Sequence, residues 1–165
     1  MSVVCKNKKG KAMRILREVR RVRVKGASRF VASEHIGSVV YGIGYRNEWF
    51  DGHLLNRVEE EVQPAEIVVS ELEGWHTDKQ IITHIGKRAN IQLTYLFKML
   101  KMQVCNQGAR LPFPQWGGLK IAYIGDMAVG IHCEPCKGWW CLNARPLCAC
   151  SGVVRKAGNI VFSLA

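Results

Sequence analysis

The chain has 165 residues, enough for one medium-sized domain, and nearly half of them are apolar, which excludes a disordered composition. It carries 24 Lys and Arg against 13 Asp and Glu, a formal net charge of +11. It lacks a run of about twenty apolar residues and the apolar core of a secretory signal, so we expect no membrane span. We therefore expect an intracellular, reducing compartment: the cytoplasm, the nucleus or, because residues 12–24 are rich in Arg, a mitochondrion.

Most of the positive charge lies in the first thirty residues. They hold eleven Lys or Arg and one acid, whereas the other 135 residues are nearly neutral. A cationic segment of this kind attracts phosphate backbones, although a solvated face of an ordinary helix or edge strand has the same composition. We interpret residues 1–30 as a basic arm that binds nucleic acid. Its expected contact residues are Lys8, Lys9, Lys11, Arg14, Arg17, Arg20, Arg21, Arg23 and Lys25.

Short β-like runs occupy the chain between the arm and residue 76. Residues 12–24 fit a helix by their apolar spacing, but the end of this segment, RRVRVKG, alternates like a strand. The runs FVAS, SVVYGIGY and EIVVSEL are rich in β-branched and aromatic residues, which favours strands. The run LLNRVEEEV before Pro64 fits either a short helix or a strand.

Two helices are predicted between residues 77 and 103. Thr77 and Gln80 form a capping box at the start of the first, and Asn90 is a suitable N-cap for the second. Apolar residues recur at helical spacing in the second helix, and we expect them to form a buried stripe. They are Leu93, Leu96, Phe97 and Leu100.

This helix pair resembles the winged helix-turn-helix family of transcription regulators, most closely across the stretch GKRANIQLTYLFKML. The resemblance covers about 27 residues and implies that the second helix enters the major groove of DNA. Packing of the two helices on a sheet is the alternative. The residues that the resemblance places toward bases and phosphates are Arg88, Gln92, Tyr95, Lys98 and Lys101.

The last forty residues are expected to form two hairpins around a cysteine-rich stretch. The first hairpin turns at Gly125-Asp126 and the second at residues 157–159. Between them lies GIHCEPCKGWWCLNARPLCACSG, in which one C-x2-C and one C-x-C motif supply thiolates at a spacing that suits a structural zinc ion. Free cysteines, disulfides and catalysis are the alternatives. The predicted ligands are Cys133, Cys136, Cys148 and Cys150, with His132 or Cys141 as substitutes for one of them.

The sequence therefore predicts an α+β fold in which β-rich ends flank a central helical pair. We divide it into the arm (1–30), an α+β core (31–125) and a zinc module with a terminal β-hairpin (126–165). We expect a nucleic-acid-binding protein, a regulator, whose arm gives affinity and whose zinc ion, Zn²⁺, is structural. The alternative is a non-enzymatic interaction protein of viral, phage or ribosome-associated type that docks on RNA or a large protein partner. We expect no enzyme, because the residues assemble no complete catalytic constellation.

Overall fold

A computed structural model describes residues 14–104, 118–134, 139–149 and 152–165 of the chain. Strands predominate there, with 46% of the described residues in strands and 25% in helices. The strands are β1 (Leu16–Val24), β2 (Ala27–Val31), β3 (Ile43–Arg46), β4 (Val58–Val62), β5 (Ala65–Leu72), β6 (His76–Thr77), β7 (Lys120–Ile124), β8 (Met127–Glu134), β9 (Trp139–Pro146), β10 (Val154–Arg155) and β11 (Ile160–Leu164). The helices are α1 (Glu48–His53), α2 (Asp78–Ile85) and α3 (Leu93–Val104), and two short 3₁₀ helices span Ala32–Glu34 and Gly86–Ala89.

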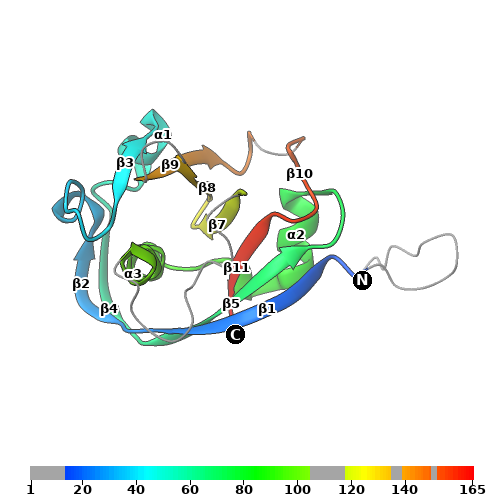
Figure 1. Cartoon of the computed structure of the whole chain (residues 1–165), viewed down its shortest axis with the longest axis horizontal. Coiled ribbons are helices and arrows are strands. Elements are labelled where there is room, and N and C mark those ends of the chain that lie inside the picture. Colours follow the sequence, from blue (N-terminus) through cyan, green and yellow to red (C-terminus); the bar gives the residue numbers. More distant parts are fainter. Residues whose placement is uncertain (1–13, 105–117, 135–138, 150–151) are drawn as a thin grey trace, which may run out of the picture.

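The main sheet has seven strands in the order β1-β5-β11-β7-β8-β9-β3. Most neighbours are antiparallel, but β11 runs parallel to β7 and β3 runs parallel to β9. Strands from the expected arm, core and C-terminal segments therefore all belong to this one sheet. It curves around α3, which is seen nearly end-on inside the ring of strands in Figure 1.

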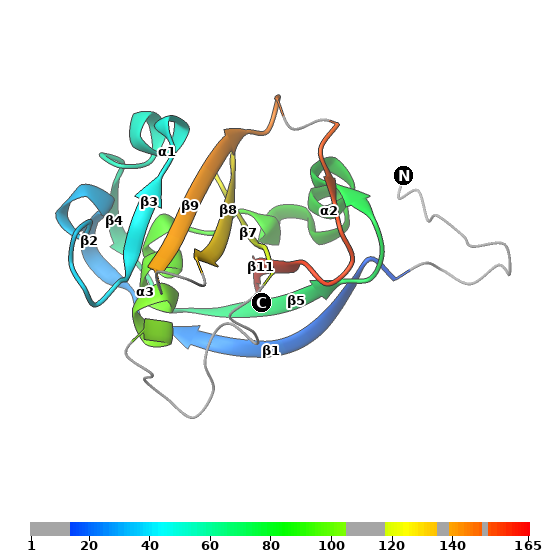
Figure 2. The same cartoon turned by 45° about the horizontal axis from the view of Figure 1, so that its top comes forward.

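A long bent ribbon continues the sheet on one side of α3. β1 leads into β2 and β4 leads into β5, and the two halves pair as β1 with β5 and β2 with β4. At the bend, a β-carbon on Gly26 would overlap the carbonyl oxygen of Val62, so only glycine fits this close approach of two backbones. Figure 2 shows how the ribbon turns from β1 into β2 and wraps α3.

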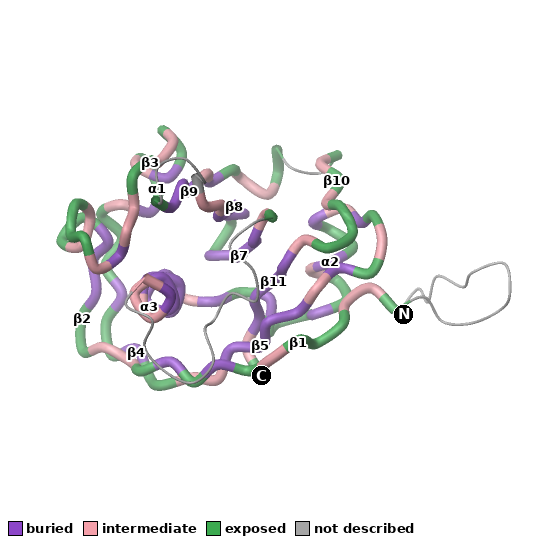
Figure 3. Tube along the Cα trace, in the orientation of Figure 1, coloured by how far each residue is buried: buried purple, intermediate pink, exposed green. Residues whose placement is uncertain are grey.

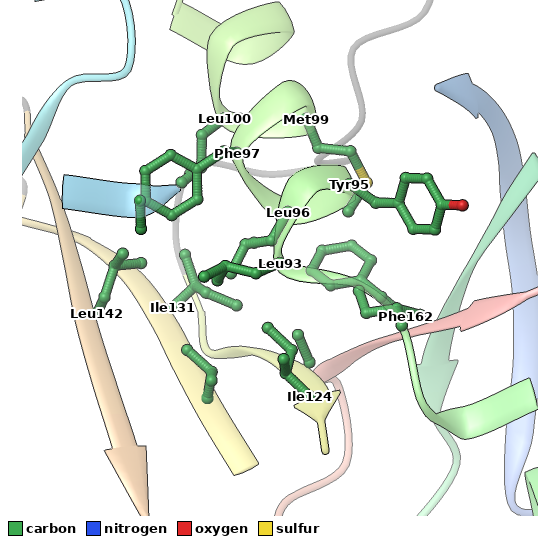
Figure 4. Close-up of a cluster of buried hydrophobic side chains, with 14 of the residues drawn as sticks. Leu93, Tyr95, Leu96, Phe97, Met99, Leu100, Ile124, Ile131, Leu142 and Phe162 are labelled. Atoms are coloured by element: carbon green, nitrogen blue, oxygen red, sulfur yellow. The ribbon is translucent and has the colours of Figure 1, made fainter. Parts of the chain in front are cut away.

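The inner side of the sheet and α3 enclose the larger hydrophobic core. Leu93, Leu96, Phe97 and Leu100 are all fully buried, as their helical spacing predicts. Figure 4 shows these side chains facing inner residues of the surrounding strands, among them Ile124, Ile131, Leu142 and Phe162. Strands enclose α3 on most sides, so packing of its side chains against these strands stabilises the helix.

A buried carboxylate caps the start of α3. Glu59 of β4 accepts hydrogen bonds at 2.8 Å from the backbone N–H groups of Leu93 and Thr94, and at 2.7 Å from the Thr94 hydroxyl. A carboxylate at this position satisfies orphan N–H groups and complements the positive end of the helix dipole. The predicted N-cap, Asn90, is wrong, because its side chain instead accepts a hydrogen bond from the backbone N–H of Gly125.

Helix α2 packs on the outer side of the same sheet. Ile81 and Ile85 of α2 join a second apolar cluster with side chains of β5, β7 and β11. The predicted capping box at Thr77 and Gln80 is confirmed. Asp78, in the first turn, is paired through both carboxylate oxygens with Arg155 at 2.8 Å, which connects the C-terminal segment to this helix.

The prediction of an α+β fold with a central helix-turn-helix pair is therefore wrong. In a helix-turn-helix the two helices pack against each other, whereas here α2 and α3 belong to apolar clusters on opposite sides of a mostly β structure. The hairpin at Gly125-Asp126 is confirmed by the pairing of β7 with β8. The terminal hairpin is wrong, because β10 pairs with β6 while β11 pairs with β5 and β7.

Candidate nucleic-acid interface

Within the described part of the basic arm, β1 is an edge strand of the main sheet and most of β2 follows it. Val22 and Val24 of β1 point into the core around α3, so the alternation of the strand places Arg21, Arg23 and Lys25 on the outer side. All three of these cations are exposed. Lys8, Lys9 and Lys11 lie outside the described residues.

Carboxylates of the chain itself neutralise part of this strand. Arg17 lies 2.7 Å from Glu71, and Arg21 lies 2.8 Å from Glu18 and 3.2 Å from Glu66. The hydrogen bond from Arg21 lowers the pKa of the Glu18 carboxyl and so favours the charged pair. Such exposed pairs stabilise little and are screened by salt, so phosphates can compete for these guanidinium groups.

The other described arm cations differ in their partners. Arg29 lies 2.7 Å from Glu34, whereas Arg23 and Lys25 appear in none of the described ion pairs. The Arg14 side chain donates to the carbonyl oxygen of Leu16 at 3.0 Å, and Arg20 is half-buried. The outer side of β1 thus retains positive charge at its Arg23 end.

The predicted recognition helix cannot enter a DNA groove. Tyr95 is buried, and its hydroxyl donates to the carbonyl oxygen of Gln63 at 2.8 Å, within the bent ribbon. Met99 and Gln103 are also buried, and Figure 3 shows α3 purple along most of its length. The sequence predicted the apolar stripe correctly but not the strands that cover the other sides of the helix.

The remaining predicted base-contacting residues lie apart from one another. Gln92 is half-buried at the start of α3, whereas Arg88 is exposed in the 3₁₀ helix after α2. Lys98 and Lys101 are half-buried near His35, which stacks on Phe30 with ring centroids 4.9 Å apart. Burial lowers the pKa of His35; Glu34 opposes this effect, and both lysines add to it.

The described cysteines do not converge on one metal ion. Cys133 lies opposite Trp140 near one end of the β8–β9 pair, and Cys148 follows Pro146 at the other end. Six residues of strand separate these ends, about 20 Å. A zinc–sulfur bond of about 2.3 Å cannot bridge that span, so Cys133 and Cys148 cannot both be ligands of one ion. Cys136 and Cys150 lie outside the described residues.

His132 and Cys141 are the two predicted ligands that the structure brings together. They are direct cross-strand partners on β8 and β9, which places their β-carbons about 5 Å apart. Among the residues that the structure describes, no group of three or more His, Cys, Asp or Glu side chains could hold a metal. A structural zinc ion stays a prediction, which metal analysis of the purified protein tests.

An exposed aromatic region on β3 and β9 was not recognised in the sequence. Tyr45 of β3 lies opposite Cys141, and Trp139 stands two residues before Cys141 on the same side of β9. Since Trp140 and Leu142 face the α3 core, Trp139 and Cys141 face outward. Tyr45 and Trp139 are 52% and 37% exposed. Their type favours strands, but only the pairing of β3 with β9 brings them side by side.

Lys120 is the one buried cation of the described core. Its ammonium nitrogen donates to the carbonyl oxygen of Gly118 at 3.0 Å and lies 5.6 Å from the centroid of the Trp140 ring. Burial lowers the pKa of this amine to about 8, although Cys133 acts in the opposite direction. Because Lys120 lies on the inner side of the sheet, we expect it to affect the stability of the fold rather than binding at the outer surface.

Comparison of the chain with protein-family models, with curated proteins and with solved structures gives no match. Among the described helices, none has the length and apolar character needed to cross a lipid bilayer.

Proposed function

We propose that the protein binds nucleic acid through its basic arm and the outer side of β1. The observation that carries this proposal is the segregation of charge: the first thirty residues have eleven cations and one acid, while the rest of the chain is nearly neutral. A segregated cationic segment binds phosphate backbones by releasing condensed counterions.

The position of β1 supports this proposal. As an edge strand it presents Arg21 and Arg23 on one side, and Lys25 is exposed directly after its end. Residues on the same side of a strand recur about every 6.6 Å, close to two steps of the roughly 3.4 Å axial rise between phosphates of a duplex strand, so these cations can contact every second phosphate. The ion pairs of Arg21 are exposed and can exchange for phosphate contacts.

A salt titration tests the proposal. We would measure the affinity of the full chain for a labelled 20-nucleotide single strand and a 20-base-pair duplex by fluorescence anisotropy between 50 and 300 mM salt. The double variant Arg23→Gln, Lys25→Gln removes two cations, and it should lower the slope of log affinity against log salt by about 1.4 for single strands.

A matched control removes two exposed cations outside the arm. The double variant Lys79→Gln, Lys87→Gln changes the net charge equally but acts on α2 and the 3₁₀ helix after it. Its salt slope should stay near that of the unmodified chain. Absence of salt-dependent binding by the unmodified chain, or equal slopes for the two double variants, would contradict the proposal.

A further inference from the structure

Among the described residues, four aromatic side chains are exposed, and three of them come from one region of the molecule. Tyr45 belongs to β3, Trp49 to α1, which begins two residues after β3, and Trp139 to β9, the neighbour of β3. The fourth, Trp75, precedes β6. Figure 2 shows β3, β9 and α1 together at one end of the sheet. Exposed aromatic rings that cluster in this way mark a binding surface more often than scattered ones.

The Trp139 indole lies directly against the neighbouring strand at Gly44. A β-carbon on Gly44 of β3 would overlap this indole, so the ring lies directly over the glycine. Trp139 is nevertheless 37% exposed, so part of the ring remains open to solvent. The absence of a side chain at Gly44 therefore leaves room for the indole, which lies next to the exposed ring of Tyr45.

None of the described helices packs over the rings of Tyr45 and Trp139, although Gly130 and Cys141 on the neighbouring strands are buried. Helix α2 packs on β5, β7 and β11, and the single buried residue of α1, Phe50, belongs to the core around α3. Between and beside the two rings, the outward residues of β8 and β9 are small or polar. They are Gly130, His132, Cys141, Asn143 and Arg145.

We propose that the outer side of β3 and β9 is a stacking platform for unpaired bases, so that the ligand of the protein is single-stranded RNA or DNA. This proposal rests on the proposed function, because stacking alone does not select a polyanion. Aromatic rings on an open sheet surface stack with bases whose faces are free, whereas the bases of a duplex already stack on one another. Arg145 is exposed on the same side of β9, about 13 Å along the strand from the level of Tyr45, and provides a cation for the backbone of a bound strand.

The platform and the arm can contact the same strand. β1 and β3 are the two ends of the seven-stranded sheet, six strand spacings apart, or about 29 Å along its surface. Helix α2 packs on the outer side between them, on β5, β7 and β11, so a strand that contacts both ends must pass around this helix. Arg23 of β1, Tyr45 and Trp139 face the outer side, and Lys25 is exposed directly after β1. A single strand of about twenty nucleotides exceeds this span and is the appropriate probe.

The test compares single strands with duplexes for variants of the platform. In the full chain, Tyr45→Ser and Trp139→Ser should each weaken binding of a labelled 20-nucleotide RNA or DNA strand about 5- to 150-fold, the range expected for the loss of one stacked base. Binding of the 20-base-pair duplex and the salt slope should not change. Tyr45→Phe keeps the ring and should bind like the unmodified chain.

Two further variants separate the stacking role from folding. Trp75→Ser removes an indole that is 65% exposed outside the platform, and it should leave single-strand affinity unchanged. Gly44→Ala keeps every aromatic ring but displaces the Trp139 indole, so it should weaken single-strand binding while circular dichroism reports an intact fold.

Two results would overturn the platform and leave the proposed function in place. One is single-strand affinity that survives Tyr45→Ser and Trp139→Ser while the arm variant still lowers the salt slope. The other is an equal loss of single-strand and duplex affinity in those variants. If the unmodified chain binds neither probe at any salt concentration, the proposed function itself fails and the platform proposal fails with it.

Discussion

The two sides of the curved sheet use the same residue types for different purposes. On the inner side, Tyr95, Phe97 and Trp140 are buried around α3 and hold the fold together. On the outer side, Tyr45 and Trp139 are exposed on neighbouring strands. The cations differ in the same way, since Lys120 is enclosed inside while Arg23 and Lys25 project from the edge strand. Composition alone therefore does not distinguish an aromatic residue or a lysine of the core from one that is exposed at the surface.

The largest effect should follow from a cavity on the inner side. Leu96 is fully buried in α3, so Leu96→Ala removes apolar contacts and leaves a hole that the surrounding strands cannot fill. We expect the free energy of unfolding to fall by about 2–5 kcal/mol, measured by urea denaturation. A loss below about 1 kcal/mol would mean that α3 is not enclosed by the sheet.

The buried amine of Lys120 should give a smaller effect that depends on pH. Its pKa in the folded protein is about 8, below that of a free lysine, so between about pH 8 and 10.5 the unfolded chain binds more protons than the folded one. The contribution of Lys120 to the free energy of unfolding therefore rises as the pH rises from about 8 to 10.5. It is lowest below pH 8, where the folded state must hold a buried charge.

Replacement of the amine by an apolar group of similar length tests this pH dependence. Lys120→Met should be more stable than the unmodified chain at pH 7, by up to roughly 3 kcal/mol, and the difference should shrink toward pH 10. Denaturation at a series of pH values measures it. A constant difference across pH 7–10 would show that Lys120 keeps its ordinary pKa in the folded protein.

The outer side should show the smallest effect on stability. Tyr45 is more than half exposed, so Tyr45→Ser should change the free energy of unfolding by no more than about 0.5 kcal/mol, in the same urea assay as Leu96→Ala. A loss of more than about 1 kcal/mol in the free energy of unfolding would show that the Tyr45 ring stabilises the fold as the buried rings do.

Local patterns in the sequence determined several elements of this protein correctly. The spacing of Leu93, Leu96, Phe97 and Leu100 predicts the buried stripe of α3, the Thr77–Gln80 box fixes the start of α2, and Gly125-Asp126 predicts the β7–β8 turn. Each of these signals acts over a few neighbouring residues, so a window of sequence contains all the necessary information. The concentration of positive charge near the N-terminus is likewise a property of the sequence alone.

Long-range strand pairing decided the rest. Whether Tyr95 contacts DNA or Gln63 depends on a ribbon that begins at Leu16, nearly eighty residues earlier, and the cap of α3 comes from Glu59 rather than from Asn90 nearby. The cysteines show the same principle: their spacing in sequence suits a metal site, but in an extended hairpin each residue adds about 3.3 Å and alternates sides, which separates Cys133 from Cys148. Tyr45 and Trp139, far apart in sequence, become neighbours only because β3 pairs with β9. Register and the choice of pairing partner are set by the packing of the whole core, and no local window of sequence contains that information.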